Sequence, residues 1–420
     1  MKRYLFLALL LSSISAFCDV RSDFIADKHR SASNYYAYPD KDLPVLTPAP
    51  EGYKPFYLSH YARHGSRWLI TPQDYSFPVQ QLEIGERNGK LTKRGKEVLN
   101  TLREVMRQSD KRLGELSDIG AEQHQGIARR MAENFPEIFN GKGKIDAKST
   151  VVIRCILSML NETNTLMRLN PELQITTDAS AHDMYYMNHH DTIAVKAQNA
   201  ARQMVNEFRN RHIKPEKLLN RLFSDKKFAA DSIDGMKFTT MLFDLVGNMQ
   251  SHHAFDDIDL YDLFPLDEMI EAWKCVNARW YTLAGDTPLT GRKCHLAHAN
   301  LLRNIVETAD SEISSQKHRA TLRFGHESVV LPTVCLMGLN GMDYSTDDLE
   351  SLANNWQCYK VFPMAANFQL IFYRKTGSDI VLVKILLNER EARLPIGTDC
   401  FPYYKWSDVR QHFIERIDGK

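Results

Sequence analysis

Residues 57–67 read YLSHYARHGSR, a hydrophobic run that ends among basic side chains. The run has strand character and predicts a β-strand that ends at Arg63. His64, Gly65 and Arg67 follow the strand exit. Neutral imidazole is a competent nucleophile near pH 7, and planar guanidinium groups bind phosphate oxygens through paired hydrogen bonds. The stretch therefore suits phosphoryl transfer, and a chance Arg-His-Gly sequence in a surface turn is the alternative.

The rest of the chain alternates between helix-like and strand-like patterns. Ser117 is a suitable N-cap for a helix that Pro136 would end. Residues 160–290 have an amphipathic helical pattern with no convincing strand, and the turn at 375–379 predicts a β-hairpin. We expect a loop at 74–90, helices at 91–106, 117–135 and 328–339, and strands at 150–155, 321–326, 367–374 and 380–387.

This alternation is typical of an α/β fold. The helical block in the middle indicates an insertion, so we predict a discontinuous α/β core with a central sheet flanked by helices, plus an inserted all-helical lobe. The core would comprise residues 19–155 and 291–420, and the lobe residues 156–290. A ligand site is expected in the cleft between the two parts.

Two further segments supply groups that phosphoryl transfer needs. Arg154 comes at the end of the hydrophobic run 150–155, where α/β sheets place their ligand sites. The alternative is an arginine that only marks the end of a strand. His326 and Glu327 follow the next expected strand. An alkoxide leaves poorly unless it is protonated, so a general acid is required, and the Glu327 carboxyl group is the candidate. Capping of the following helix is the structural alternative for this pair.

These motifs resemble the histidine phosphatase superfamily, whose signature is R-H-G-x-R, and within it the branch of acid phosphatases, phytases and multiple inositol polyphosphate phosphatases. The resemblance implies that His64 becomes phosphorylated and that Arg63 and Arg67 bind the transferred phosphate. Arg154 begins RCILS, which is similar to the family's Arg-Cys-x-x-Ser and implies a third phosphate-binding arginine. His326 would be a further hydrogen-bond donor to the phosphate.

Other segments narrow the resemblance to one branch. LLNEREARLP at 386–395 and Ala-Ala-Asn at 365–367 look like the inositol polyphosphate phosphatases. That branch has His-Ala-Glu where this chain has His326, Glu327 and Ser328, whereas the acid phosphatases have His-Asp. The family often has a substrate-facing lysine near residues 29–36, where this chain offers only Arg30 as a nearby cation.

The N-terminus predicts export. Lys2 and Arg3 precede a short apolar run, and small residues follow, so residues 1–18 are expected to be a signal peptide. The run is too short to span a bilayer, so stable membrane insertion is not expected. The protein would be periplasmic or secreted. Acylation of Cys18 as a lipoprotein is the alternative, which the bulky Phe17 disfavours.

The overall charge argues against nucleic acid as a partner, because the 420 residues carry a net charge of only +1.

The cysteines leave the disulfide content open. After Cys18 six cysteines remain, an even number that permits disulfides, although Cys155 and Cys335 suit buried thiols equally well. No CxxC pair occurs, so a zinc site built on cysteine is not expected. The adjacent pairs His189-His190 and His252-His253 would make poor chelates, and neither a metal nor a cofactor is expected. Residues 196–237 hold ten Lys and Arg against five Asp and Glu. A solvated helix face explains this excess most simply, and attraction of a polyanionic substrate is the alternative.

The leading hypothesis is a metal-independent phosphomonoesterase that acts on phytate and lower inositol polyphosphates. A broad-specificity acid or sugar phosphatase is the first alternative, and a non-catalytic phosphate-binding protein on the same fold is the second. The sequence indicates neither the oligomeric state nor the phosphate that is removed first.

Overall fold

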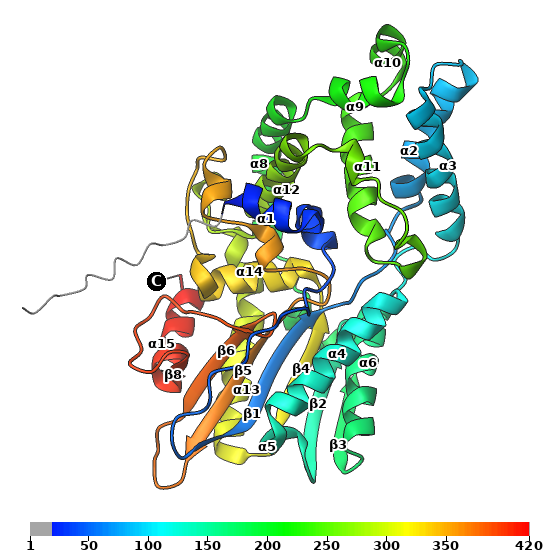
Figure 1. Cartoon of the computed structure of the whole chain (residues 1–420). Helices are drawn as coiled ribbons and strands as arrows, with labels where there is room; N and C mark the ends of the chain where they lie inside the picture. Colours follow the sequence, from blue (N-terminus) through cyan, green and yellow to red (C-terminus); the bar gives the residue numbers. More distant parts are fainter. Residues whose placement is uncertain (1–18, 420) are drawn as a thin grey trace, which may run out of the picture.

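The computed structural model describes residues 19–419, and it confirms the α/β fold with a central sheet flanked by helices (Figure 1). The expected signal peptide, Cys18 included, lies outside the described residues. Eight strands form one sheet in the order β3-β2-β4-β1-β5-β6-β7, and the eighth pairs with β6. Their bounds are β1 Tyr53–Arg63, β2 Gly143–Ser149, β3 Leu173–Asp178, β4 Ala320–Gly325, β5 Asn367–Lys375, β6 Leu382–Leu387, β7 Arg390–Glu391 and β8 Tyr403–Lys405.

Parallel pairing brings the exits of two strands to the same edge of the sheet. β1 runs parallel to β4, and its last residue Arg63 is the register partner of Gly325. The residues that follow these strands, His64 and His326, therefore start from neighbouring points. On its other side β1 pairs with β5 in antiparallel orientation, and β5 and β6 form the expected hairpin.

The helices surround the sheet and build a second lobe above it in the view of Figure 1. Side chains of β1 alternate between two cores, as the period of a strand dictates. Leu58 and Ala62 join one core, and Tyr57 and Tyr61 join the other. The helices are α1 Val20–Ala26, α2 Pro72–Arg87, α3 Lys93–Gln108, α4 Asp118–Asn134, α5 Pro136–Phe139, α6 Ile153–Leu169, α7 Met184–Met187, α8 Thr192–His212, α9 Pro215–Leu222, α10 Lys226–Ser232, α11 Gly235–Met249, α12 Leu266–Ala284, α13 Ala299–Ser315, α14 Glu327–Met337 and α15 Trp406–Ile417.

Three local predictions were wrong. The expected loop at 74–90 is mostly helix α2, which begins with Pro72 and a capping box between Thr71 and Asp74. The expected strand at 150–155 is a bend at 150–152 followed by the first residues of helix α6, and Val151 and Ile153 face solvent with 51% and 73% of their surface exposed. β3 lies in the segment that was expected to lack strands, and it is an edge strand of the sheet.

The helical lobe draws on more than one stretch of the chain. α2 packs against α11, and α3 packs against α9. The predicted boundary between residues 155 and 156 falls inside α6, and that helix contacts β2 and β4 of the sheet. Helices α2 and α3 thus pack against helices of the lobe, although the sequence analysis assigned them to the core. The limits of the two domains stay a prediction.

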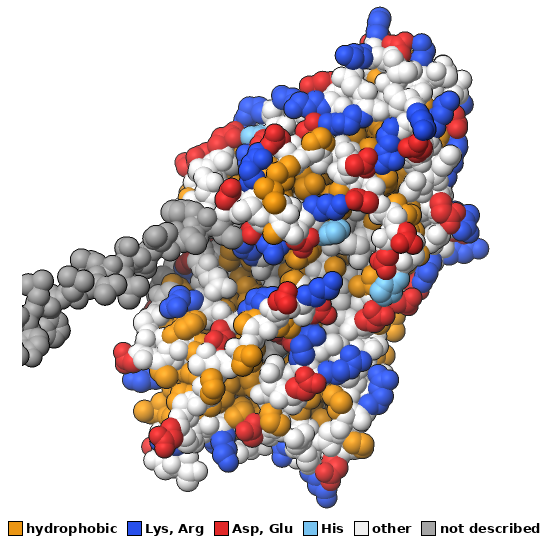
Figure 2. Space-filling model, in the orientation of Figure 1, with side chains coloured by type: hydrophobic (Ala, Val, Ile, Leu, Met, Phe, Trp, Pro, Cys, Tyr) orange, Lys and Arg blue, Asp and Glu red, His pale blue; other side chains and the backbone are white. Residues whose placement is uncertain are grey.

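The described residues carry no disulfide. Cys155 and Cys335 are buried free thiols, one of the two interpretations that the sequence left open, and Cys400 is an exposed one. Among the helices of the described part, none combines the length and apolar character that a membrane span requires. On the face in Figure 2, acidic and basic side chains are interspersed.

Because Gly65 has no side chain, the segment after β1 can lie very close to helix α4. A Cβ atom on Gly65 would lie 2.3 Å from the carbonyl oxygen of Gly120, and a Cβ on Gly120 would lie 2.2 Å from that of Ser66. Backbone atoms cannot yield as a flexible side chain can. The two glycines therefore let α4 press against the segment that carries His64.

We expect Gly120→Ala to lower the free energy of unfolding by about 1–3 kcal/mol, the usual cost of overpacking, and to reduce turnover by shifting His64. Gly126→Ala on the same helix is the matched control, because its new Cβ would meet no backbone atom but Nη1 of Arg130, the terminal nitrogen that does not bond Glu389. That variant should be neutral or more stable by up to about 1 kcal/mol. Urea unfolding checks both, and equal losses in the two variants would contradict the packing argument.

Candidate active site

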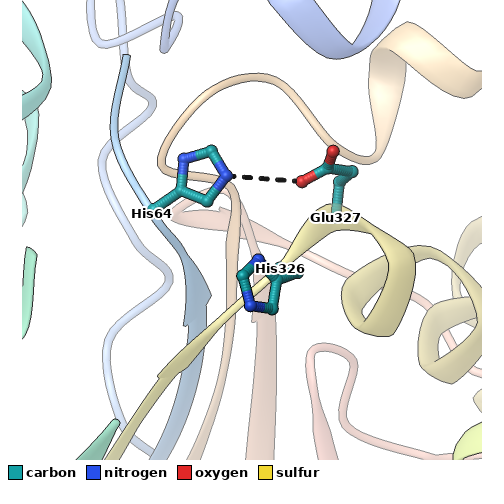
Figure 3. A group of neighbouring side chains, drawn as sticks. All are labelled: His64, His326 and Glu327. Atoms are coloured by element: carbon teal, nitrogen blue, oxygen red, sulfur yellow. Dashed lines mark ion pairs between the residues drawn. The ribbon is translucent and has the colours of Figure 1, made fainter. Parts of the chain in front are cut away.

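Three side chains meet where β1 and β4 end (Figure 3). His64 follows β1, whereas His326 and Glu327 stand at the start of α14, directly after β4. The backbone N–H of His64 donates to the carbonyl oxygen of Gly325 at 2.9 Å, which ties the two strand exits together. The His64 and His326 rings lie 5.8 Å apart between centroids.

His64 is held in one orientation. Its Nδ1 atom lies 2.9 Å from the carbonyl oxygen of Gly65. A carbonyl oxygen can only accept, so Nδ1 carries the proton and Nε2 keeps its lone pair. Nε2 is buried without a hydrogen-bond partner and lies 3.5 Å from Oε2 of Glu327. The unprotonated nitrogen thus points toward the carboxylate, as Figure 3 shows.

Arg63 is a fully buried cation anchored at one end of its guanidinium group. Its Nη1 atom donates to the carbonyl oxygens of Asn34 at 2.7 Å and Phe362 at 2.8 Å. Its Nη2 atom lies 3.1 Å from Oε2 of Glu327, and neither Nε nor Nη2 has a hydrogen-bond partner. Burial lowers the pKa of Arg63 to about 10. The charges of Arg67 and Arg154 lower it further, whereas the Glu327 carboxylate raises it. Glu327 faces this side of the group without a hydrogen bond, so an anion that displaced the carboxylate could accept from Nε and Nη2.

Arg67 and Arg154 complete the cluster of cations. Arg67 donates from Nη1 to the carbonyl oxygen of Trp68, and its buried Nε has no partner. Arg154 reaches the site from the first turn of α6 and not from a strand, and its Nε is also buried without a partner. Burial and the charge of Arg67 lower the pKa of Arg154. The structure brings the charges of both residues close enough to act on that of Arg63 or on each other, although the element that carries Arg154 differs from the prediction. The roles of Arg67 and Arg154 as phosphate ligands stay predictions.

The charges of the cluster determine the protonation states of His64 and Glu327 in the resting site. Burial lowers the pKa of His64 well below its usual value, and Arg63 and Arg67 contribute in the same direction while Glu327 opposes them. Burial raises the pKa of Glu327, but the charge of Arg63, with that of Arg67, outweighs burial and brings this pKa well below the usual range. A neutral imidazole therefore faces an ionised carboxylate.

His326 is packed behind this pair. Its Nε2 atom lies 3.3 Å from Oγ1 of Thr150 and 3.7 Å from Sγ of Cys155. Burial lowers the pKa of His326 to about 4. The charge of Glu327 raises this pKa, and the charges of Arg154 and Arg63 lower it. The ring is therefore neutral near pH 7 and can donate one hydrogen bond to an oxygen in the site.

The shape and charge of the site suit an anion. His64, His326 and Glu327 each offer a ligand atom within 4.8 Å of the others, a spacing that could also hold a metal ion. The charges of Arg63, Arg67 and Arg154 act on one another here, however, and they repel a cation. A phosphoryl group with several oxygens matches the unpartnered donors of Arg63, Arg67 and Arg154.

The family model for the histidine phosphatase superfamily (branch 2) matches residues 61–388. The chain belongs to this family. Multiple inositol polyphosphate phosphatase 1 of Gallus gallus is 25% identical over 343 residues, which cover 72% of this chain and 71% of the relative. A Bifidobacterium longum multiple inositol polyphosphate phosphatase, solved with inositol hexasulfate, superimposes with a TM-score of 0.76 at 18% identity over 91% of this chain and 97% of that one. The phytase from D. castellii gives 0.68 at 16% identity over 93% and 86%.

Arg30 is engaged away from this histidine phosphatase site. Its Nη1 atom pairs with Asp23 at 2.9 Å, and its Nε lies 3.8 Å from Asp27. The interactions of Arg30 within residues 19–419 therefore satisfy its charge locally, and none of them joins it to His64. Its role as a phosphate ligand stays a prediction.

Two supporting networks were not predicted from the sequence. Gln123 accepts from the N–H of Ser66 and donates to its hydroxyl group, and the Ser158 hydroxyl accepts from the N–H of Gly65. These contacts hold the loop after His64. The Gln-His pair in the expected α4 helix was the available signal, because a buried glutamine needs polar partners.

The second network holds the segment that anchors Arg63. Asn388 donates to the carbonyl oxygen of Val361 and accepts from the N–H of Asn367. Its neighbour Glu389 is buried and accepts from Arg130 and Tyr38. Asn388 and Glu389, the pair that resembles the inositol polyphosphate phosphatases, therefore stabilise the segments that surround Arg63.

We expect the His64 imidazole of the ligand-free protein to stay neutral from pH 7.5 down to pH 5. Because its folded pKa lies below 6.5, protonation must wait for a more acidic pH. Histidine ¹⁵N chemical shifts check this, with His64→Gln to assign the signal. His253, whose pKa is raised by Glu122 and Asp256, should be charged at pH 6 and serves as the internal control. A His64 midpoint near 6.5 would contradict the assignment.

Proposed function

We propose that the protein is a phosphomonoesterase that hydrolyses inositol polyphosphates, phytate included, through a phosphohistidine at His64. The observation that carries the proposal is the unpartnered Nε2 of a neutral His64 beside the free donors of three arginines. Membership of the family supports the chemistry. The names of the chicken relative and of the Bifidobacterium structure support the substrate class.

In the first step Nε2 of His64 attacks phosphorus and the bond to the substrate oxygen breaks. Arg63, Arg67 and Arg154 hold the phosphoryl oxygens and neutralise their charge, and His326 donates a further hydrogen bond. The leaving alkoxide takes a proton from Glu327. In the second step Glu327 accepts a proton from water, which attacks phosphorus, and inorganic phosphate leaves as His64 regains its lone pair.

Glu327 must gain a proton before it can give one. In the resting site the carboxylate lies against Arg63, and this cation lowers its pKa. A bound phosphate takes over the free donors of Arg63 and brings its own negative charge next to the carboxylate. Both changes raise the pKa of Glu327, so the carboxylate takes up a proton from solvent as the substrate binds and becomes the general acid. The proton that Glu327 accepts from water in the second step returns to solvent when phosphate leaves.

The N-terminal segment supports a second proposal on location. A basic start and a short apolar run fit export to the periplasm or secretion. An extracytoplasmic site would also give the enzyme access to inositol polyphosphates outside the cell.

Phosphate release from phytate and from p-nitrophenyl phosphate tests the function. Wild type should release phosphate from both and prefer phytate by kcat/KM, and His64→Ala should lose activity on both. An unchanged unfolding transition confirms that the variant is folded. Wild-type activity on the aryl phosphate with no advantage for phytate would favour a broad-specificity phosphatase, and activity of His64→Ala would sink the mechanism.

Glu327→Gln separates the general acid from a positioning role. We expect kcat on phytate to fall by about 10²-fold or more, because the poor alkoxide leaving group needs a proton. The loss on p-nitrophenyl phosphate should be much smaller, since nitrophenolate leaves without one. Steady-state kinetics of both substrates check this, and equal losses would leave Glu327 only a positioning role.

A further inference from the structure

The last turn of helix α11 brings the helical lobe against the segment that carries Arg67. Asn248 lies in this turn and is buried. Its Nδ2 atom donates to the main-chain carbonyl oxygen of Arg67 at 3.1 Å. Arg67 in turn donates from Nη1 to the carbonyl oxygen of Trp68 at 2.9 Å, while its Nε stays without a partner among the described residues. The lobe therefore holds this arginine through its backbone and leaves part of its guanidinium group to a ligand.

His252 fixes the orientation of the Asn248 amide group. A carbonyl oxygen can only accept, so Nδ2 of Asn248 must face Arg67 and Oδ1 must face away from it. Oδ1 lies 3.4 Å from Nε2 of His252, which therefore carries the ring proton. Burial, with the charge of Arg112, lowers the pKa of His252 to about 3, so the ring is neutral near pH 7 and has this one proton to donate.

The His252 ring also packs against Trp68, the residue that follows Arg67. The two ring centroids lie 3.9 Å apart, with 32° between the ring planes. Phe255 meets the Trp68 ring in a perpendicular arrangement at 5.8 Å, and the guanidinium carbon of Arg112 lies 5.0 Å from that ring. Trp68 and His252 are both buried. The backbone at Arg67 is thus held by a hydrogen bond to its carbonyl group and by packing of the next side chain.

The same turn of α11 also contacts the segment that anchors Arg63. This segment is the 3₁₀ helix η1 (Lys28–Tyr35), in which the Asn34 carbonyl oxygen accepts from Arg63. A Cβ atom on Gly247 would lie 2.9 Å from the Cβ of Ala32, so the glycine allows η1 to lie directly against α11. The end of α11 therefore contacts the surroundings of both arginines.

We infer that Asn248, held by His252, is a positioning residue that fixes the main chain at Arg67 and so directs the Arg67 guanidinium group at the bound phosphoryl group. The inference rests on the proposed function for the role of Arg67 as a phosphate ligand. Asn248 bonds the backbone of Arg67, so its removal should act on anion binding through Arg67 alone. The bond also ties anion binding to the placement of the lobe, because Asn248 belongs to the lobe and Arg67 to the segment after β1.

A double-mutant cycle tests this without turnover, with inositol hexasulfate as the ligand and calorimetry as the measurement. Asn248→Leu keeps nearly the same shape and removes both hydrogen bonds of the amide. We expect Asn248→Leu and Arg67→Gln each to weaken hexasulfate by about tenfold, the effect of losing a charge-assisted hydrogen bond. The double variant should bind no more weakly than Arg67→Gln. Effects that multiply in the double variant would overturn the inference, because Asn248 would then act independently of Arg67.

Three further variants separate positioning from a loss of stability. His252→Phe keeps an aromatic ring but loses the proton donated to Asn248, so it should weaken hexasulfate by about threefold. It replaces Asn248→Leu in the cycle if that variant does not fold. Leu242→Ala removes a buried side chain six residues earlier on α11, so it should lower the urea midpoint yet bind within about twofold of wild type. His253→Phe, at the exposed neighbour that pairs with Glu122, should bind like wild type.

The outcomes separate this inference from the proposed function. Unchanged hexasulfate affinity in the Asn248 and His252 variants would overturn the inference, whatever the enzyme does to phytate. Equal weakening by Leu242→Ala would also overturn it, because loss of stability would then explain the effect. Weakening that is confined to the Asn248 and His252 variants, and that disappears once Arg67 is replaced, would support it. Failure of wild type to hydrolyse phytate would instead refute the proposed function, since the cycle depends on binding alone.

Discussion

The buried charge of Arg63 is the constraint on which the active site depends. A guanidinium group with no exposure to water is costly unless oxygen atoms surround it. Carbonyl oxygens of Asn34 and Phe362 satisfy one side, and the Glu327 carboxylate faces the other. These partners come from the N-terminal segment, from the loop before β5 and from the start of α14. The position of Arg63 therefore links three distant parts of the chain.

The same arrangement explains the reactivity of its neighbours. Cations and burial keep the His64 imidazole neutral, and the Gly65 carbonyl leaves Nε2 free. Glu327 stays ionised because Arg63 is close, so in the resting site this carboxylate can accept a proton but cannot donate one. In the proposed mechanism the phosphoryl group of the substrate replaces Glu327 on Arg63, so that one cation couples substrate binding to acid catalysis.

Sequence reasoning succeeded where the signal was local. The hydrophobic run to Arg63, the Ser117 N-cap and the hairpin around Gly377 each depend on neighbours in the chain, and the structure has all three. Arg154 was placed on a strand because its apolar neighbours suggested burial, but Ile153 faces solvent and starts a helix. Which face of a segment meets the core depends on tertiary packing, which one sequence does not reveal.

The central claim is that Nε2 of His64 carries the phosphoryl group during turnover. Rapid-quench mixing of the enzyme with a radiolabelled aryl phosphate, followed by peptide mapping, tests it most directly. The account predicts acid-labile, base-stable phosphate on the peptide that contains His64 within the first turnover, and none in His64→Ala. Label on another residue, or a full turnover with no labelled protein at any time point, would contradict it.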